Sequence, residues 1–135
     1  MLLAGLLLAA APPASACAIS VEAAADGSFA QAGWDGRPQR LVPLARLTRQ
    51  RFEATARRLC GAGALRPADL ARFRRLVVQN GEGATEPLLY RTPDMPAGSW
   101  VFQYAFQDGG PPPAEEFERA LRCWKNPKMA GCYED

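Results

Sequence analysis

Four cysteines behind an export-type leader restrict the fold of this chain more than any other feature. The leader, residues 1–16, combines an uncharged apolar run, a Pro-Pro break and the small residues Ala14-Ser15-Ala16. This arrangement is typical of a cleaved secretory signal, so we expect a single exported domain over residues 17–135. Export to an oxidising compartment makes every remaining cysteine a candidate for a disulfide bond. The four are Cys17, Cys60, Cys123 and Cys132.

Four cysteines allow three pairings, and we favour Cys17–Cys60 together with Cys123–Cys132. The last two bracket a short segment with turn residues at both ends, so a bridge there would fasten the tail to the last helix. The other bridge would fasten an N-terminal arm to the end of the first helix. A zinc site is disfavoured, because the sequence has no close C-x₂₋₄-C pair and no histidine. We therefore expect no metal and no cofactor.

Cys17 also supports a second interpretation of the leader. Ala14-Ser15-Ala16-Cys17 resembles a bacterial lipoprotein box, in which Cys17 would carry a lipid and tether the protein to a membrane. However, Ala14 stands where such boxes usually carry Leu, and lipidation would leave an odd number of cysteines for pairing. We therefore favour secretion without a tether. No further apolar stretch reaches the length of a membrane span, so none is expected in the mature chain.

Hydrophobic periodicity predicts an α+β domain with an extended arm over residues 17–40 and a body over residues 41–135. Apolar residues at three- and four-residue spacing predict helices, of which the first two should form an antiparallel hairpin. Alternation at period two predicts a half-buried strand that pairs with a shorter one as an antiparallel β-hairpin. The expected helices span 43–60, 67–78 and 114–124, and the expected strands span 88–90 and 100–107.

The apolar faces of these elements predict one shared core. The long strand presents four aromatic side chains on one face, and three amphipathic helices are available to cover them. Burial in the core is therefore favoured over an exposed aromatic platform for a sugar or a peptide. The four aromatics are Trp100, Phe102, Tyr104 and Phe106, and the rest of the expected core is Leu44, Phe52, Leu59, Leu70, Phe73, Val77, Phe117, Leu121 and Trp124.

Arginine is concentrated in one part of the chain. Residues 37–75 hold eleven arginines against Glu53 and Asp69, whereas residues 82–135 hold nine acidic and five basic residues. We favour a solvated basic face that pairs with the acidic C-terminal part, and we keep an anion-binding surface as the alternative. Exported proteins seldom meet nucleic acid, so no nucleic-acid partner is expected. The arginines of the alternative surface are Arg46, Arg49, Arg57, Arg72 and Arg75.

No catalytic motif is present in the sequence. The absence of histidine removes Ser-His and Cys-His catalysis, and no serine lies in a Gly-x-Ser-x-Gly elbow. We therefore favour a non-enzymatic binding or accessory protein of the bacterial cell envelope, whose partner would be an envelope or extracellular protein or polymer. The first alternative is a carboxylate-dependent hydrolase of a cell-wall or extracellular polymer, and the second is the lipoprotein anchored through Cys17. The candidate catalytic acids of the hydrolase would be Glu82, Glu86, Asp94 and Asp108.

Overall fold

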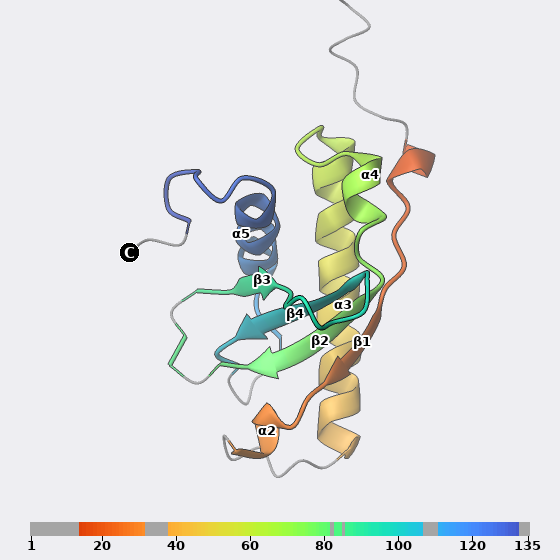
Figure 1. Ribbon diagram of the computed structural model, residues 1–135. Helices are drawn as coiled ribbons and strands as arrows, with labels where there is room; N and C mark the ends of the chain where they lie inside the picture. The colour runs from red at the N-terminus through yellow and green to blue at the C-terminus, as the bar shows by residue number, and fades with distance from the viewer. Residues whose placement is uncertain (1–13, 32–37, 82, 85, 107–110, 133–135) are drawn as a thin grey trace, which may run out of the picture.

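The computed structural model describes residues 14–31, 38–81, 83–84, 86–106 and 111–132 (Figure 1). The protein is a mixed α+β domain in which a four-stranded sheet packs against two long helices, and two disulfides join its segments. The elements are the 3-10 helix η1 (Ala14–Cys17), β1 (Glu22–Ala25), α2 (Ser28–Gln31), α3 (Pro38–Gly61), α4 (Pro67–Leu70), β2 (Arg75–Asn80), β3 (Leu88–Tyr90), β4 (Ser99–Tyr104) and α5 (Ala114–Lys125).

The strands lie in the order β1-β2-β4-β3. The predicted antiparallel hairpin is present, because β3 pairs antiparallel with β4 and places Leu89 opposite Phe102. Strand β4 ends at Tyr104, earlier than expected, and Gln107 lies outside the described residues. The sequence did not predict the other half of the sheet, in which β1, β2 and β4 run parallel.

Both long helices cover the same face of the sheet (Figure 1). The inward side chains of the central strands meet this helical layer, and Phe102 stacks on Phe117 of α5 with ring centroids 4.8 Å apart. Phe52 and Leu59 of α3 are completely buried in the same core. The opposite face of the sheet carries no described helix. Because side chains alternate along a strand, that face receives every second residue of β2 and β4.

The predicted helix over residues 67–78 is wrong. Helix α4 stops at Leu70, and the chain then enters β2, which hydrogen-bonds to β1 on one side and to β4 on the other. Leu70, Phe73 and Leu76 are buried, so their spacing fitted a helix by coincidence. Val77 and Val78 are β-branched and favour a strand, and pairing on both edges decides the outcome. The predicted helical hairpin is therefore absent.

The predicted core is largely correct, with one exception that follows from the formation of β2. Val77, which was expected in the core, does not belong to it. Leu76 and Val78 point towards the helices and are completely buried. Val77 lies between them and therefore points to the uncovered face, where it is only half-buried. Tyr104 and Trp124 pack against the core while staying partly exposed.

The predicted disulfides are both present. Cys17 is bonded to Cys60 at the end of α3, and Cys123 of α5 is bonded to Cys132 in the tail. The leader prediction falls mainly on residues 1–13, which lie outside the described part of the chain. Among the described helices, none is both long enough and apolar enough to cross a membrane.

The N-terminal arm is more regular than predicted, because residues 22–25 form β1 at the edge of the sheet. A buried carboxylate holds the start of this strand, where Glu53 of α3 accepts a hydrogen bond of 2.8 Å from the backbone N–H of Val21. Phe29 then anchors the arm as a completely buried side chain. The arm is thus part of the core rather than a loop pinned to its surface.

Candidate functional site

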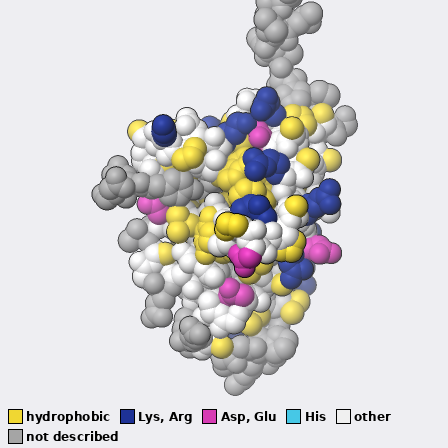
Figure 2. Space-filling model, in the orientation of Figure 1, with side chains coloured by type: hydrophobic (Ala, Val, Ile, Leu, Met, Phe, Trp, Pro, Cys, Tyr) yellow, Lys and Arg dark blue, Asp and Glu magenta, His cyan; other side chains and the backbone are white. Residues whose placement is uncertain are grey.

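Three arginines converge on Trp100 in an open pocket of about 400 Å³. Arg72 and Arg74 lie on either side of Phe73 in the segment between α4 and β2, and Arg91 directly follows β3. Because Phe73 enters the core, its two neighbours project outwards and are exposed. Figure 2 shows one face of the molecule, with Lys and Arg side chains beside a hydrophobic strip in its middle. The remaining lining residues are Ala71, Ala97 and Gly98.

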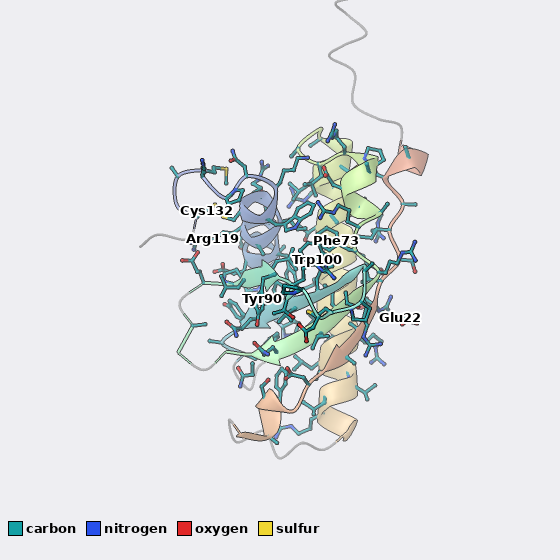
Figure 3. The ribbon with its side chains drawn as sticks, viewed as in Figure 1. Glu22, Phe73, Tyr90, Trp100, Arg119 and Cys132 are labelled. Atoms are coloured by element: carbon teal, nitrogen blue, oxygen red, sulfur yellow. A yellow bond between two sulfur atoms is a disulfide. The ribbon has the colours of Figure 1, made fainter. Side chains whose placement is uncertain are left out.

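Aromatic contacts hold the floor of the pocket in place. Only 6 % of the surface of Trp100 is exposed. Its indole Nε1–H donates a 2.9 Å hydrogen bond to the carbonyl oxygen of Arg72. Its ring centroid lies 5.0 Å from that of Phe73 (Figure 3). The distance to the ring centroid of Trp124 is 5.7 Å. Phe73 in turn contacts Phe52 of α3 at 5.3 Å. The pocket is therefore built directly on the core.

Two of the guanidinium groups lie over this aromatic floor. The Cζ atom of Arg72 is 5.6 Å from the Trp100 centroid and 5.3 Å from the Trp124 centroid, and the Cζ atom of Arg91 is 5.8 Å from the Trp100 centroid. Cations at these distances are attracted to the electron-rich ring faces. The aromatic floor therefore stabilises the positive charge of Arg72 and Arg91 within the pocket.

Backbone carbonyl groups fix the position of Arg91. Its Nη2 atom donates hydrogen bonds to the carbonyl oxygens of Met95 at 2.7 Å and Pro96 at 3.1 Å, and its Nε–H donates to that of Ser99 at 3.3 Å. Neutral carbonyl groups satisfy the donors without cancelling the charge. Arg91 therefore closes the loop between β3 and β4 and remains a cation at the pocket wall.

The positive charge of the pocket is not neutralised within the described part of the chain. Ion pairs there join Arg58 and Arg122 to Glu118 and Arg119 to Glu86, but none of them involves Arg72, Arg74 or Arg91. None of the described residues that line the pocket is acidic. Three like charges around a partly apolar floor create a positive potential that favours an anion.

Gly98 is the position at which the pocket depends on a residue without a side chain. Its φ of +84° lies in the left-handed region, and a Cβ atom there would lie 3.0 Å from the Cγ and Cδ atoms of Arg74. Its carbonyl oxygen accepts hydrogen bonds from the backbone N–H groups of Arg74 and Arg75. Glycine therefore lets the loop turn while the Arg74 side chain passes beside it.

A buried ion pair joins the two segments that carry Arg72 and Trp124. Asp69 of α4 is 6 % exposed, and its carboxylate accepts hydrogen bonds from the backbone N–H of Arg66 at 2.8 Å and from Nζ of Lys125 at 3.0 Å. Burial would raise the pKa of Asp69, but these two hydrogen bonds and the charge of Lys125 outweigh it. The pKa of Asp69 is therefore below its ordinary value of 3.8.

We expect Asp69→Asn to lower the free energy of unfolding at pH 7 by about 1–3 kcal/mol, because hydrogen bonds to a charged group are lost. A lowered folded-state pKa stabilises the fold fully above the unfolded-state pKa, and this stabilisation disappears as the pH falls through the folded-state value. Urea unfolding of both proteins between pH 7 and pH 2 should therefore show the difference shrinking below about pH 4. A difference that stays constant over this range would contradict the assignment.

Of the four predicted aromatic residues, Trp100, Phe102 and Tyr104 share one face of β4 and Phe106 follows the strand, but the four do not form an exposed platform. Phe102 is completely buried, Trp100 and Phe106 are each 6 % exposed, and Tyr104 is half-buried. Burial raises the pKa of Tyr104, and the nearby charge of Glu116 adds to the shift. These residues therefore act mainly as core, and only Trp100 lines the arginine pocket.

The five arginines of the predicted anion surface lie on different elements. Arg46 and Arg57 are exposed on α3, and Arg49 pairs with Glu53 at 3.5 Å. Arg75 begins β2 and lies 4.0 Å from Glu22. Of the five, only Arg72 lines the pocket. Its other two cations, Arg74 and Arg91, were not among the predicted residues.

The acidic residues considered for hydrolysis do not form a pair in the described structure. Glu82 and Asp108 lie outside the described residues. Glu86 is bound to Arg119 at 3.2 Å, and Asp94 accepts a hydrogen bond from the Thr92 hydroxyl, which lowers the pKa of Asp94. A general acid at neutral pH needs a raised carboxyl pKa, so Asp94 is poorly suited to that role. Within the described ranges, no cluster of three or more histidine, cysteine, aspartate or glutamate residues could hold a metal ion.

Comparisons with known proteins give no assignment. No protein-family model, curated protein or solved structure matches this chain. The class of protein is therefore defined by its own features, namely a disulfide-stabilised α+β domain with an arginine-lined pocket.

Proposed function

We propose that this chain is a small, exported, non-enzymatic binding protein of the cell envelope or extracellular space, and that its arginine pocket binds an anionic ligand. The observation that carries the proposal is the set of three guanidinium groups, Arg72, Arg74 and Arg91, with no carboxylate partner among the described residues. Arginine presents a planar fork of donors suited to carboxylate and phosphate oxygens. A volume of about 400 Å³ falls within the range of small-ligand sites.

The disulfides support the exported part of the proposal. Disulfides form and persist mainly in oxidising compartments outside the cytosol. The bond between Cys17 and Cys60 also uses the sulfur atom that a lipid anchor would need. This pairing favours secretion without a tether over the lipoprotein alternative. Intact mass measured before and after reduction would reveal an acyl group on Cys17.

The distribution of carboxylates supports binding rather than hydrolysis. A glycosidase-type mechanism needs two carboxyl groups held a few ångströms apart, one of them with a raised pKa. In the described part of the chain, Asp69, Asp94 and Glu118 have lowered pKa values; for Glu118 the cause is hydrogen bonding to Arg58 and Arg122. The hydrolase alternative instead predicts turnover of peptidoglycan or glycan substrates by the purified protein.

We expect the double variant Arg72→Gln/Arg74→Gln to bind citrate at least about tenfold more weakly than the wild type, because two charge-assisted contacts are lost. Calorimetric titration with citrate, against chloride at matched ionic strength, measures the change. Citrate is a suitable probe because its three carboxylates can contact several guanidinium groups at once.

The matched control is Arg46→Gln/Arg57→Gln, which removes the same charge from two exposed positions on α3. It should bind citrate within about twofold of the wild type, because exposed charges are screened at physiological salt. Equal losses in the two double variants would refute the pocket and support a diffuse basic surface. Absence of citrate binding by the wild type would refute the proposed function itself.

A further inference from the structure

An apolar groove runs along the outer edge of the sheet. Strand β3 contributes Leu88, Leu89 and Tyr90, and the groove has a volume of about 310 Å³. Strand β3 is the last in the sheet order and pairs only with β4 among the described strands. An edge strand leaves alternate backbone N–H and C=O groups without a strand partner. The other lining residues are Cys123, Trp124 and Pro127.

The groove lies next to the arginine pocket. Tyr90 lines the groove, and the next residue, Arg91, lines the pocket. On the opposite wall, Trp124 lines the groove, while the guanidinium group of Arg72 lies 5.3 Å from its ring centroid. An apolar site and a cationic site therefore lie next to each other, at the end of the same edge strand.

We infer that the groove and the pocket together bind an extended peptide segment of a partner protein, which adds alongside β3. An apolar side chain of the peptide would pack against Leu88 and Trp124, and an acidic group would meet the cations beyond Tyr90. This inference rests on the proposed function, because it specifies the class of anion that the pocket takes. Strand addition supplies backbone hydrogen bonds, and pockets for individual side chains supply specificity.

The positive charge of the arginine pocket favours a peptide with an acidic group over a peptide that is only apolar. Arg72, Arg74 and Arg91 have no ion-pair partner among the described residues, so a peptide without an acidic group would leave them uncompensated. Because side chains two residues apart share one face of a strand, the apolar and acidic residues should be two positions apart. The acidic group is a carboxylate, supplied by Asp or Glu or by the C-terminus of the peptide.

The test uses two pools of randomised octapeptides, one with free and one with amidated C-termini, presented to the immobilised full-length protein. Mass spectrometry of the bound fraction should show peptides with an apolar residue two positions from a carboxylate enriched about tenfold or more. Enrichment confined to the free-ended pool would assign the carboxylate to the C-terminus. Enrichment through Asp and Glu in both pools would assign it to side chains.

Two variants with the same charge change separate the groove from the rest of the sheet surface. Leu88→Glu places a charge in the groove, whereas Val77→Glu places one at a half-buried position that does not line it. Leu88→Glu should abolish the preference for an apolar residue, and Val77→Glu should preserve it, with circular dichroism reporting the fold of each. Phe or Leu preference that survives in Leu88→Glu would overturn the inference.

The two proposals fail in different ways. If the wild type binds citrate but selects no peptide class from either pool, the peptide inference is wrong and the anion pocket stands. If the wild type does not bind citrate, the proposed function is wrong, and the peptide inference that rests on it falls as well. Peptide selection that is unchanged in Arg72→Gln/Arg74→Gln would also overturn the inference, because the cations would then have no part in it.

Discussion

Replacement of Phe73 by alanine is expected to lower the free energy of unfolding by about 3–5 kcal/mol. Phe73 is 2 % exposed, and its ring contacts Phe52 at 5.3 Å, Trp100 at 5.0 Å and Trp124 at 4.8 Å. The substitution would leave a cavity where α3, α5 and the sheet meet. Urea unfolding monitored by circular dichroism measures the loss.

Phe73→Leu should cost less than half as much, because it keeps most of the apolar volume. Arg74→Ala, one residue along the chain, controls for position and should change stability by no more than about 0.5 kcal/mol, as expected for an exposed side chain. A loss below about 1 kcal/mol for Phe73→Ala would show that the ring does not occupy the core described here. Because Phe73 supports Trp100, the alanine variant should also bind citrate more weakly.

The second large effect concerns the disulfide of the N-terminal arm. Cys17→Ser/Cys60→Ser should lower the free energy of unfolding by about 4 kcal/mol, because the bond closes a loop between residues 43 positions apart. The Cys123–Cys132 bond closes a loop between residues only 9 positions apart, so Cys123→Ser/Cys132→Ser should cost about 2.5 kcal/mol. The longer loop has more conformational entropy in the unfolded chain, so its bridge stabilises the fold more.

Chemical denaturation of the two double-serine variants measures both values, and the fully reduced wild type provides a control that should lose more than either variant. A larger loss for the Cys123–Cys132 pair than for the Cys17–Cys60 pair would contradict the assigned connectivity. Peptide mapping without reduction should recover the same two pairs from the wild type.

The sequence predicted best those elements that have a strong local pattern. Helix α5 has acidic residues in its first turn and a clear apolar face, and the structure contains it at almost the predicted bounds. The hairpin of β3 and β4 was found because the long strand alternates strictly from Trp100 onwards. Cysteine parity and spacing were sufficient for both disulfides.

The parallel part of the sheet could not be predicted from local patterns. Residues 23–25 are three alanines, which have low strand propensity, and they form β1 only because β2 pairs with them and α3 packs on them. The spacing of Leu70, Phe73 and Leu76 is compatible with a helix and also with a turn followed by a strand. Contacts between residues distant in the sequence decide between these structures, and local spacing does not contain that information.

The same misassigned segment explains why most of the site was missed. With residues 67–78 taken as a helix, Arg72 and Arg74 fall on different parts of a helical surface, whereas in the turn before β2 both are exposed on either side of the buried Phe73. Arg91 is separated from them in the sequence and reaches Trp100 only through the β3–β4 loop. The pattern Arg-Phe-Arg, met just before a β-branched strand, was the signal available.

The most direct test of the anion pocket is a citrate titration followed by ¹H–¹⁵N NMR at constant ionic strength. The indole N–H of Trp100 donates to the backbone carbonyl of Arg72, so it should report any change in the pocket. We expect the largest shifts at this indole and at the backbone amides of Arg72, Arg74 and Gly98. Shifts concentrated at Arg46 and Arg57 on α3, with an unmoved Trp100 indole, would contradict the assignment of the binding site.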